Sequence, residues 1–205
     1  MYICIEGNIG AGKTTLAIEL ARKWKAFFLA ESYEDNPLLP LFYKDKKKMA
    51  FPLEYSFLID RHAQLHNYFK SSKEQKKTIA DFSLYKCLWF AKTNLSKKEY
   101  ALYKKHFKAI EEVTSTPDLI IYINTHHNNL LGNIKKRGRT FESTIDKKYL
   151  ISVNKSYQSG LNKLTIPVIE FEVSVYNNKT SAAIIKALDV YSSKKIKQKY
   201  CKVKV

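Results

Sequence analysis

Eight residues near the start of the chain have the types and spacing that hold phosphate groups. Residues 7–14 read GNIGAGKT and fit the pattern G-x-x-x-x-G-K-[ST], between an expected strand at residues 2–6 and an expected helix at residues 13–26. In this pattern, backbone N–H groups face phosphate oxygens, Lys13 neutralises the β and γ oxygens, and the Thr14 hydroxyl can bind Mg²⁺. The sequence therefore predicts a nucleoside-triphosphate site. Its residues are Gly7, Asn8, Ile9, Gly10, Ala11, Gly12, Lys13, Thr14 and Thr15.

Two acidic residues and one basic segment can add chemistry beside that site. Glu31 follows the second expected strand, and Asp81 follows the residues TIA at 78–80. Segment 133–142 reads NIKKRGRTFE, and its two arginines on either side of a glycine suit a lid that clamps a transferring phosphoryl group. A basic helix end, favoured by the helix dipole, is the alternative interpretation of this segment. The sequence has no N-K-x-D pattern, so it favours phosphoryl transfer over a GTPase switch.

Alternating strand and helix signals must position these residues. Strands are expected at residues 2–6, 27–30, 78–80, 118–124 and 167–173. Between them, Pro52 is expected to open a long helix, and Ser96 with Glu99 matches a capping box. Strands separated by helices pair in parallel through right-handed crossovers. We therefore expect an α/β fold in one domain, residues 1–190, followed by a mobile lysine-rich tail, residues 191–205.

The charge of the chain raises the question of nucleic-acid binding. The formal net charge is +17, and clustered Lys and Arg bind a phosphate backbone by releasing its counterions. The lysine-rich segments, however, are separate from one another, and no aromatic and basic stacking motif joins them. They lie at residues 44–48, 73–77, 104–108 and 194–199. This scatter favours a solvated lysine-rich surface with a local phosphate site over a polynucleotide partner.

The cysteines and the hydropathy pattern bear on the compartment. Cys4, Cys87 and Cys201 are odd in number and lack metal-ligand spacing, so free thiols in a reducing compartment are expected. No apolar run reaches the roughly 20 residues that span a bilayer, and the chain enters a strand pattern without a basic leader. We expect a cytoplasmic protein that does not associate with membranes.

The ordered set of motifs resembles the deoxynucleoside kinases. The similarity runs through IEGNIGAGKTT, NPLLPLFYKD, PLEYSFLIDR, PDLIIYI and RGRTFE, and covers roughly residues 1–172. It implies a P-loop fold with a five-stranded parallel sheet, flanking helices and a helical lid, usually in a homodimer. It also implies transfer of the γ-phosphoryl group of ATP, with Mg²⁺, to the 5′-hydroxyl of a small deoxynucleoside.

The resemblance also implies a role for each matching residue. Glu31 matches the family's general base, which accepts the proton of the 5′-hydroxyl. The implied catalytic residues are Glu31, Lys13, Arg137 and Arg139. Thr14 and Asp81 are the implied Mg²⁺ ligands, Asp81 through water. The implied substrate-binding residues are Glu31, Tyr43, Glu54, Arg61, Asp81 and Glu142, of which Tyr43 and Glu142 match the pair that holds the sugar 3′-hydroxyl.

Glu54 and Arg61 bear on the choice of base. They are seven residues apart, two helical turns, so both project from one face of the long helix. In the family this face reads the base, with Gln usual at the first position. An ionised Glu only accepts hydrogen bonds, which suits guanine N1–H and N2–H₂ or an exocyclic amine of adenine or cytosine. We expect a preference for purines, with deoxyguanosine favoured. Alternatively, Arg61 forms a plain ion pair with Asp60 or Glu54.

Phe82 departs from the family's pattern, which has Arg after the acidic residue of the third strand. Without that guanidinium the barrier to transfer should rise, unless Arg61 or a lid arginine supplies the charge. One alternative is therefore a nucleotide-binding relative whose catalysis is impaired. Another is a thymidylate-type nucleoside monophosphate kinase, although its Asp-Arg-Tyr after the third strand is absent.

Overall fold

The computed structural model describes residues 1–71, 77–193 and 199–205. It is an α/β fold with one parallel sheet in the order β2-β3-β1-β4-β5-β6. The strands are β1 Tyr2–Gly7, β2 Phe27–Leu29, β3 Thr78–Ala80, β4 Leu119–Thr125, β5 Val168–Val173 and β6 Tyr200–Lys204. The five strands expected from the sequence are thus confirmed, and a sixth joins them.

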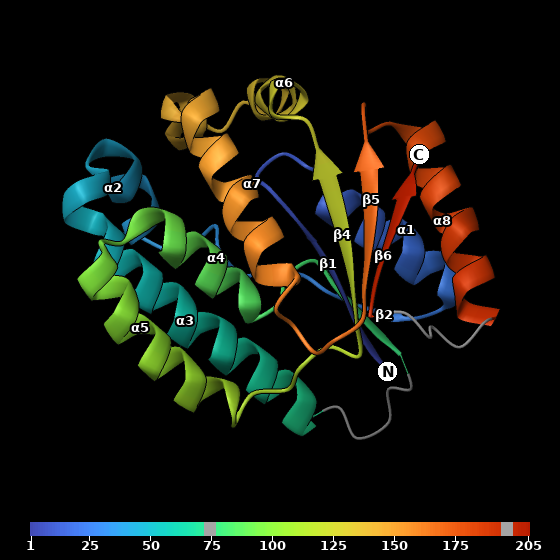
Figure 1. Ribbon diagram of the computed structural model, residues 1–205, viewed down its shortest axis with the longest axis horizontal. Helices are drawn as coiled ribbons and strands as arrows, with labels where there is room; N and C mark the ends of the chain where they lie inside the picture. The colour runs from blue at the N-terminus through green and yellow to red at the C-terminus, as the bar shows by residue number, and fades with distance from the viewer. Residues whose placement is uncertain (72–76, 194–198) are drawn as a thin grey trace.

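Helices cover both faces of this sheet. They are α1 Lys13–Trp24, α2 Leu38–Lys44, α3 Lys46–Ser71, α4 Tyr85–Asn94, α5 Lys97–Glu111, α6 His127–Arg137, α7 Lys147–Leu161 and α8 Asn178–Ser193, with a 3-10 turn η1 at Thr140–Thr144. Figure 1 shows α1 and α8 on one side of the sheet, and α3, α4, α5 and α7 on the other. Because both faces are covered, every residue of β1 is buried. Among the described ranges, no helix is both long enough and apolar enough to cross a bilayer.

The sixth strand corrects the expectation of five strands. Residues 200–204, which we expected in a C-terminal tail, pair in parallel with β5. Tyr200 donates its hydroxyl to the buried carboxylate of Glu170, and the Nζ of Lys202 lies 3.5 Å from the same carboxylate. Tyr200, Lys202 and Lys204 alternate with Cys201 and Val203, the period of a strand. The strand was not expected because the lysines give the segment the composition of a charged tail.

The long helix also begins earlier than expected. Pro52 was expected to open it, but α3 starts at Lys46 and contains Pro52 in its interior, where proline costs about 3 kcal/mol. Asp45 explains the early start, because its side chain accepts a hydrogen bond from the N–H of Lys48 (3.1 Å) and its carbonyl accepts one from Met49 (3.0 Å). The capping box of Ser96 and Glu99 at the start of α5, by contrast, is confirmed.

The fold gathers the chemically interesting residues at one edge of the sheet. Since all strands are parallel, their carboxyl ends meet at the same edge, where α/β proteins bind ligands. Gly7 ends β1, Glu31 follows β2, and Asp81 directly follows β3. In Figure 1 the arrowheads of β4 and β5 point toward α6, so the basic lid segment reaches the same edge.

Candidate active site

The phosphate-binding loop connects β1 with α1. Gly10 and Gly12 have φ angles of 79° and 87°, in the left-handed region that favours glycine. A side chain at Gly12 would also collide with Tyr176, since its Cβ would lie 2.7 Å from that ring. The Nζ of Lys13 donates a hydrogen bond to the carbonyl of Asn8 (3.0 Å), which spans the loop. The predicted loop geometry is therefore present.

Thr14 and Asp81 form the best candidate for a Mg²⁺ site. The hydroxyl of Thr14 donates to Oδ2 of Asp81 (2.5 Å), and Oδ1 of Asp81 accepts from the N–H of Glu31 (2.8 Å). A hydroxyl and a carboxylate are hard oxygen donors, which Mg²⁺ prefers together with substrate phosphates and several waters. These donors, placed beside the phosphate-binding loop, fit the ion expected from the sequence.

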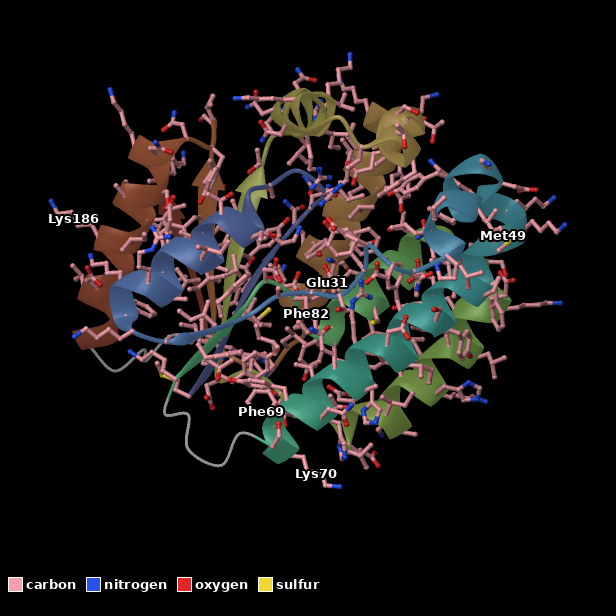
Figure 2. All side chains as sticks on the ribbon, turned by 180° about the vertical axis from the view of Figure 1, so that it is seen from behind. Glu31, Met49, Phe69, Lys70, Phe82 and Lys186 are labelled. Carbon is pink, nitrogen blue, oxygen red and sulfur yellow. The ribbon has the colours of Figure 1, made fainter. Side chains whose placement is uncertain are left out.

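Glu31 is a buried carboxylate held between two cations. Its Oε1 accepts from Nε of Arg61 (2.8 Å), and its Oε2 accepts from Nζ of Lys86 (2.5 Å). Only 5% of the Glu31 side chain is exposed, and Figure 2 shows it in the interior of the molecule. Burial alone would raise the pKa of the Glu31 carboxyl, but Lys86 and then Arg61 lower this pKa to about 2. Glu31 is therefore ionised at neutral pH.

Arg61 is held by contacts other than the ion pairs with Asp60 or Glu54 that the sequence suggested. Besides its bonds to Glu31, it donates from Nη1 to the sulfur of Cys87 (3.1 Å), and its guanidinium lies 4.5 Å from the centre of the Phe57 ring. Among the described residues, it forms no ion pair with Asp60 or Glu54. Arg61 thus lines the pocket as an anchor of Glu31.

Lys86 is the main site residue that sequence reasoning missed. It belongs to the first turn of α4, and only 10% of its side chain is exposed. The signal that could have found it is a single basic residue inside a helix whose neighbours Tyr85, Cys87 and Trp89 are all buried. Lysine at such a position needs a partner, because a buried unpaired charge is costly.

Phe82 does not enter the site. Its side chain is fully buried in the hydrophobic core, and its carbonyl accepts a hydrogen bond from the Tyr2 hydroxyl (3.2 Å). Figure 2 labels it in the interior of the molecule. The cations that meet Glu31 are Arg61, one of the two sources considered from the sequence, and Lys86, which was not considered.

Glu54 is buried in a different part of the pocket. Its Oε1 accepts from Nδ2 of Asn94 (2.6 Å), whereas its Oε2 has no hydrogen-bond partner within the part of the chain that the structure describes. Burial raises the pKa of Glu54 to about 7, although Asn94 and Arg61 oppose this shift. An unpaired buried acceptor is expensive to leave without a partner, so this oxygen points to a donor on a ligand.

The lid segment, residues 133–142, faces the phosphate-binding loop. Arg137 ends α6 and binds both oxygens of Glu142 at 2.6 Å, and Gly138, with φ of 71°, turns the chain. Beyond the turn, Arg139 pairs with Glu34 (2.5 Å). The lid contacts the loop directly through Nδ2 of Asn133, which donates to the carbonyl of Gly10 (2.8 Å).

Two adjoining pockets bring the predicted residues together. The first has about 760 Å³ of empty space and is lined by Glu31, Tyr43, Glu54, Arg61 and Glu142, with aromatic rings around them. The second, with about 1510 Å³, lies over the phosphate-binding loop and is open to solvent. They share the residues Gly10, Lys13, Thr14, Glu31, Tyr33, Asp81, Arg137 and Arg139. Such an arrangement can hold two molecules whose reacting ends meet beside Glu31.

Comparison with known proteins gives one family. The family model described as deoxynucleoside kinase matches residues 3–192. Deoxyguanosine kinase of Bacillus subtilis (strain 168) is 39% identical over 164 residues, which cover 80% of this chain and 79% of that protein. Deoxyadenosine kinase of Dictyostelium discoideum is 32% identical over 179 residues, which cover 85% of this chain and 73% of that protein. A structure of deoxyadenosine kinase from M. mycoides with bound dCTP has a TM-score of 0.80 at 27% identity and covers 93% of this chain and all of that one.

Proposed function

The chain belongs to the deoxynucleoside kinase family, and we propose that it transfers the γ-phosphoryl group of ATP to the 5′-hydroxyl of a purine deoxynucleoside, as a step in nucleotide salvage. The main support is the meeting of two pockets at Glu31, one lined by apolar and hydrogen-bonding side chains and one lying over the phosphate-binding loop. A nucleoside in the first and a triphosphate in the second would bring the 5′-hydroxyl to the γ-phosphoryl group.

In this proposal Glu31 is the general base. Its carboxylate is ionised. Both Nε and Nη2 of Arg61 contact Oε1, at 2.8 and 2.7 Å, whereas among the described residues Oε2 meets only the ammonium of Lys86 and can still accept a hydrogen bond from the 5′-hydroxyl. As the new oxygen–phosphorus bond forms, the hydroxyl proton passes to Glu31. Mg²⁺ held by Thr14 and Asp81 would neutralise charge on the β and γ phosphates.

The lid arginines are the second group of catalytic residues. Arg137 and Arg139 bind Glu142 and Glu34 in the structure. Glu142 is buried and Glu34 is exposed. Because an arginine can bind a phosphate through two parallel hydrogen bonds, we expect both guanidinium groups to turn toward the γ-phosphoryl group when ATP binds. Lys13 contributes a further positive charge on the other side of that group.

The first pocket also offers groups for the sugar. Tyr43 and Glu142 both line it, and the Glu142 charge, after burial, contributes to raising the pKa of the Tyr43 hydroxyl. The phenol can donate to the 3′-oxygen, and the carboxylate can accept from the 3′-hydroxyl. We propose this pair as the sugar-binding residues.

Glu54 underlies the proposed preference for deoxyguanosine. Its Oε2, which has no partner among the described residues, could accept hydrogen bonds from a base, and guanine offers two adjacent donors, N1–H and N2–H₂. The deoxyguanosine and deoxyadenosine kinases among the relatives support a purine. The aromatic rings that line the pocket, Phe57 and Phe90, can pack against the faces of a purine.

We expect Glu54→Gln to change the ranking of nucleosides. The amide has only one acceptor oxygen, so at pH 8, above the Glu54 pKa of about 7, kcat/KM for deoxyguanosine should fall about 10- to 100-fold, the effect of a lost hydrogen bond to a charged group. For deoxyadenosine the fall should be smaller. Steady-state kinetics with each nucleoside measure this, with the exposed Glu112→Gln as a control. An unchanged ranking would show that Glu54 does not read the base.

Turnover by the purified protein tests the proposed function itself. We expect Mg·ATP to phosphorylate at least one of the four deoxynucleosides, as followed by chromatography, and none of the four deoxynucleotides. Binding of ATP without turnover of any acceptor would favour a nucleotide-binding relative with impaired catalysis. Turnover of dTMP would favour a thymidylate-type kinase.

We also propose a cytoplasmic homodimer that binds neither membranes nor nucleic acid. Cys4 and Cys87 are buried thiols, and Cys87 accepts a hydrogen bond from Arg61; a reducing compartment would keep them as thiols. The homodimer remains a prediction from the family resemblance. Light scattering coupled to size-exclusion chromatography would measure it.

A further inference from the structure

Two cations meet Glu31, and they are held very differently. Arg61 binds Glu31, contacts the sulfur of Cys87 and lies over the Phe57 ring. Among the residues that the structure describes, the ammonium of Lys86 has one hydrogen bond, to Oε2 of Glu31, and a longer contact of 5.8 Å to the centre of the Phe90 ring. The side chain of lysine is also the more flexible of the two. Lys86 can therefore leave Glu31 while Arg61 still neutralises the carboxylate.

The position of Lys86 is not explained by the stability of its helix. Lys86 lies in the first turn of α4, where the helix dipole disfavours a positive charge. It also lines the same pocket as the phosphate-binding Lys13. Two ammonium groups that line one pocket repel each other, and an anion bound between them would relieve that repulsion.

The anion that fits is the phosphoryl group in transfer. Lys86 lines the first pocket and Lys13 lines both, so the space between them lies where the two substrates would meet. We propose, on the basis of the function proposed above, that Lys86 is a catalytic residue. Its ammonium binds Glu31 in the free enzyme and moves onto the transferring phosphoryl group when both substrates are bound.

The proposed transfer step requires no reactants other than Glu31, Lys86 and the two substrates. The 5′-hydroxyl gives its proton to Glu31 while its oxygen bonds to the γ-phosphorus. The bond between that phosphorus and the β,γ-bridging oxygen breaks, and ADP leaves with the electron pair. Lys86 transfers no proton in this step, and its charge stabilises the negative charge on the phosphoryl oxygens. With Lys86 gone from Oε2, that oxygen is also free to receive the proton.

The test separates contact with the phosphoryl group from an indirect effect through Glu31. We compare wild type with Lys86→Met, Lys86→Gln and Lys86→Arg, and with Lys92→Met, which removes a more exposed lysine of the same helix. The first readout is kcat and KM with Mg·ATP and deoxyguanosine or deoxyadenosine, whichever the wild type turns over. The second is the affinity for Mg·ADP with aluminium fluoride, a mimic of the phosphoryl group in transfer, in the presence of the same nucleoside.

The expected result is a kcat lowered about 10²- to 10³-fold in both neutral variants, with both KM values within about threefold of wild type. Affinity for the aluminium fluoride complex should fall by a similar factor, while affinity for Mg·ADP alone should stay the same. Lys86→Arg should recover part of the loss, and Lys92→Met should match wild type. Having two neutral variants guards against a folding defect in one of them.

Other outcomes overturn the proposal. Neutral variants that keep kcat would exclude a catalytic role for Lys86. A lowered kcat with unchanged affinity for the aluminium fluoride complex would show that Lys86 acts only by positioning Glu31. A wild-type protein that phosphorylates no deoxynucleoside would instead contradict the proposed function.

Discussion

Glu31→Gln is expected to lower kcat by about 10²- to 10⁴-fold, the usual contribution of a positioned general base. The amide keeps the size of the side chain but cannot accept the proton of the 5′-hydroxyl. Binding of Mg·ATP should change little, because the phosphate-binding loop and Lys13 are untouched. Steady-state kinetics and ATP titration measure these two quantities, with Glu112→Gln as the exposed control.

This result depends on Glu31 being ionised at the pH of the assay. Its pKa in the folded protein, about 2, lies below the ordinary value of 4.5. The ion pairs with Arg61 and Lys86 therefore contribute their full stability above about pH 4.5 and lose it as the pH falls toward 2. At pH 7 Glu31 is a carboxylate, so Glu31→Gln replaces a charged base by a neutral amide. Retention of wild-type kcat by a folded Glu31→Gln protein would contradict the role of Glu31 as the base.

Lys13→Met is expected to lower kcat/KM for ATP by about 10²- to 10³-fold, the range for loss of one positioned charge. The variant removes the ammonium that donates a hydrogen bond across the phosphate-binding loop to the carbonyl of Asn8. It also relieves the repulsion with Lys86, so the folded protein should not be less stable to heat. The affinity for ATP and the rate are measured together, with the exposed Arg22→Met on α1 as the control. An unchanged kcat/KM would mean that the triphosphate binds elsewhere.

The residues at the strand ends could be predicted because they depend on local patterns. GNIGAGKT follows an apolar run and precedes a helical one, and Glu31 and Asp81 each end such a run. In a parallel sheet these ends converge without any knowledge of side-chain packing. Short-range signals of this kind placed the phosphate-binding loop and the carboxylates.

The contact between Glu31 and Lys86 could not be predicted in the same way. Lys86 meets Glu31 because β2 pairs with β3, which brings the segment after β2 beside α4. The contact joins residues 55 apart in the sequence, so it depends on strand pairing and not on a local pattern. The absence of an arginine at Phe82 was evident from the resemblance. The cation that pairs with Glu31, Lys86, lies four residues further along and was not predicted. The sixth strand was missed for a related reason, since Lys202 meets its partner, the buried Glu170, only once the strand lies beside β5.

The identity and position of the phosphorylated product test the account most directly. Wild-type protein is incubated with Mg·ATP labelled in the γ-phosphoryl group and with deoxyguanosine, and the nucleoside product is isolated and examined by phosphorus–proton NMR. The account predicts that the label appears in one product, phosphorylated at the 5′-oxygen, with one ADP formed for each molecule of product. Label that stays in ATP, passes only to water, or appears on the 3′-oxygen would contradict it.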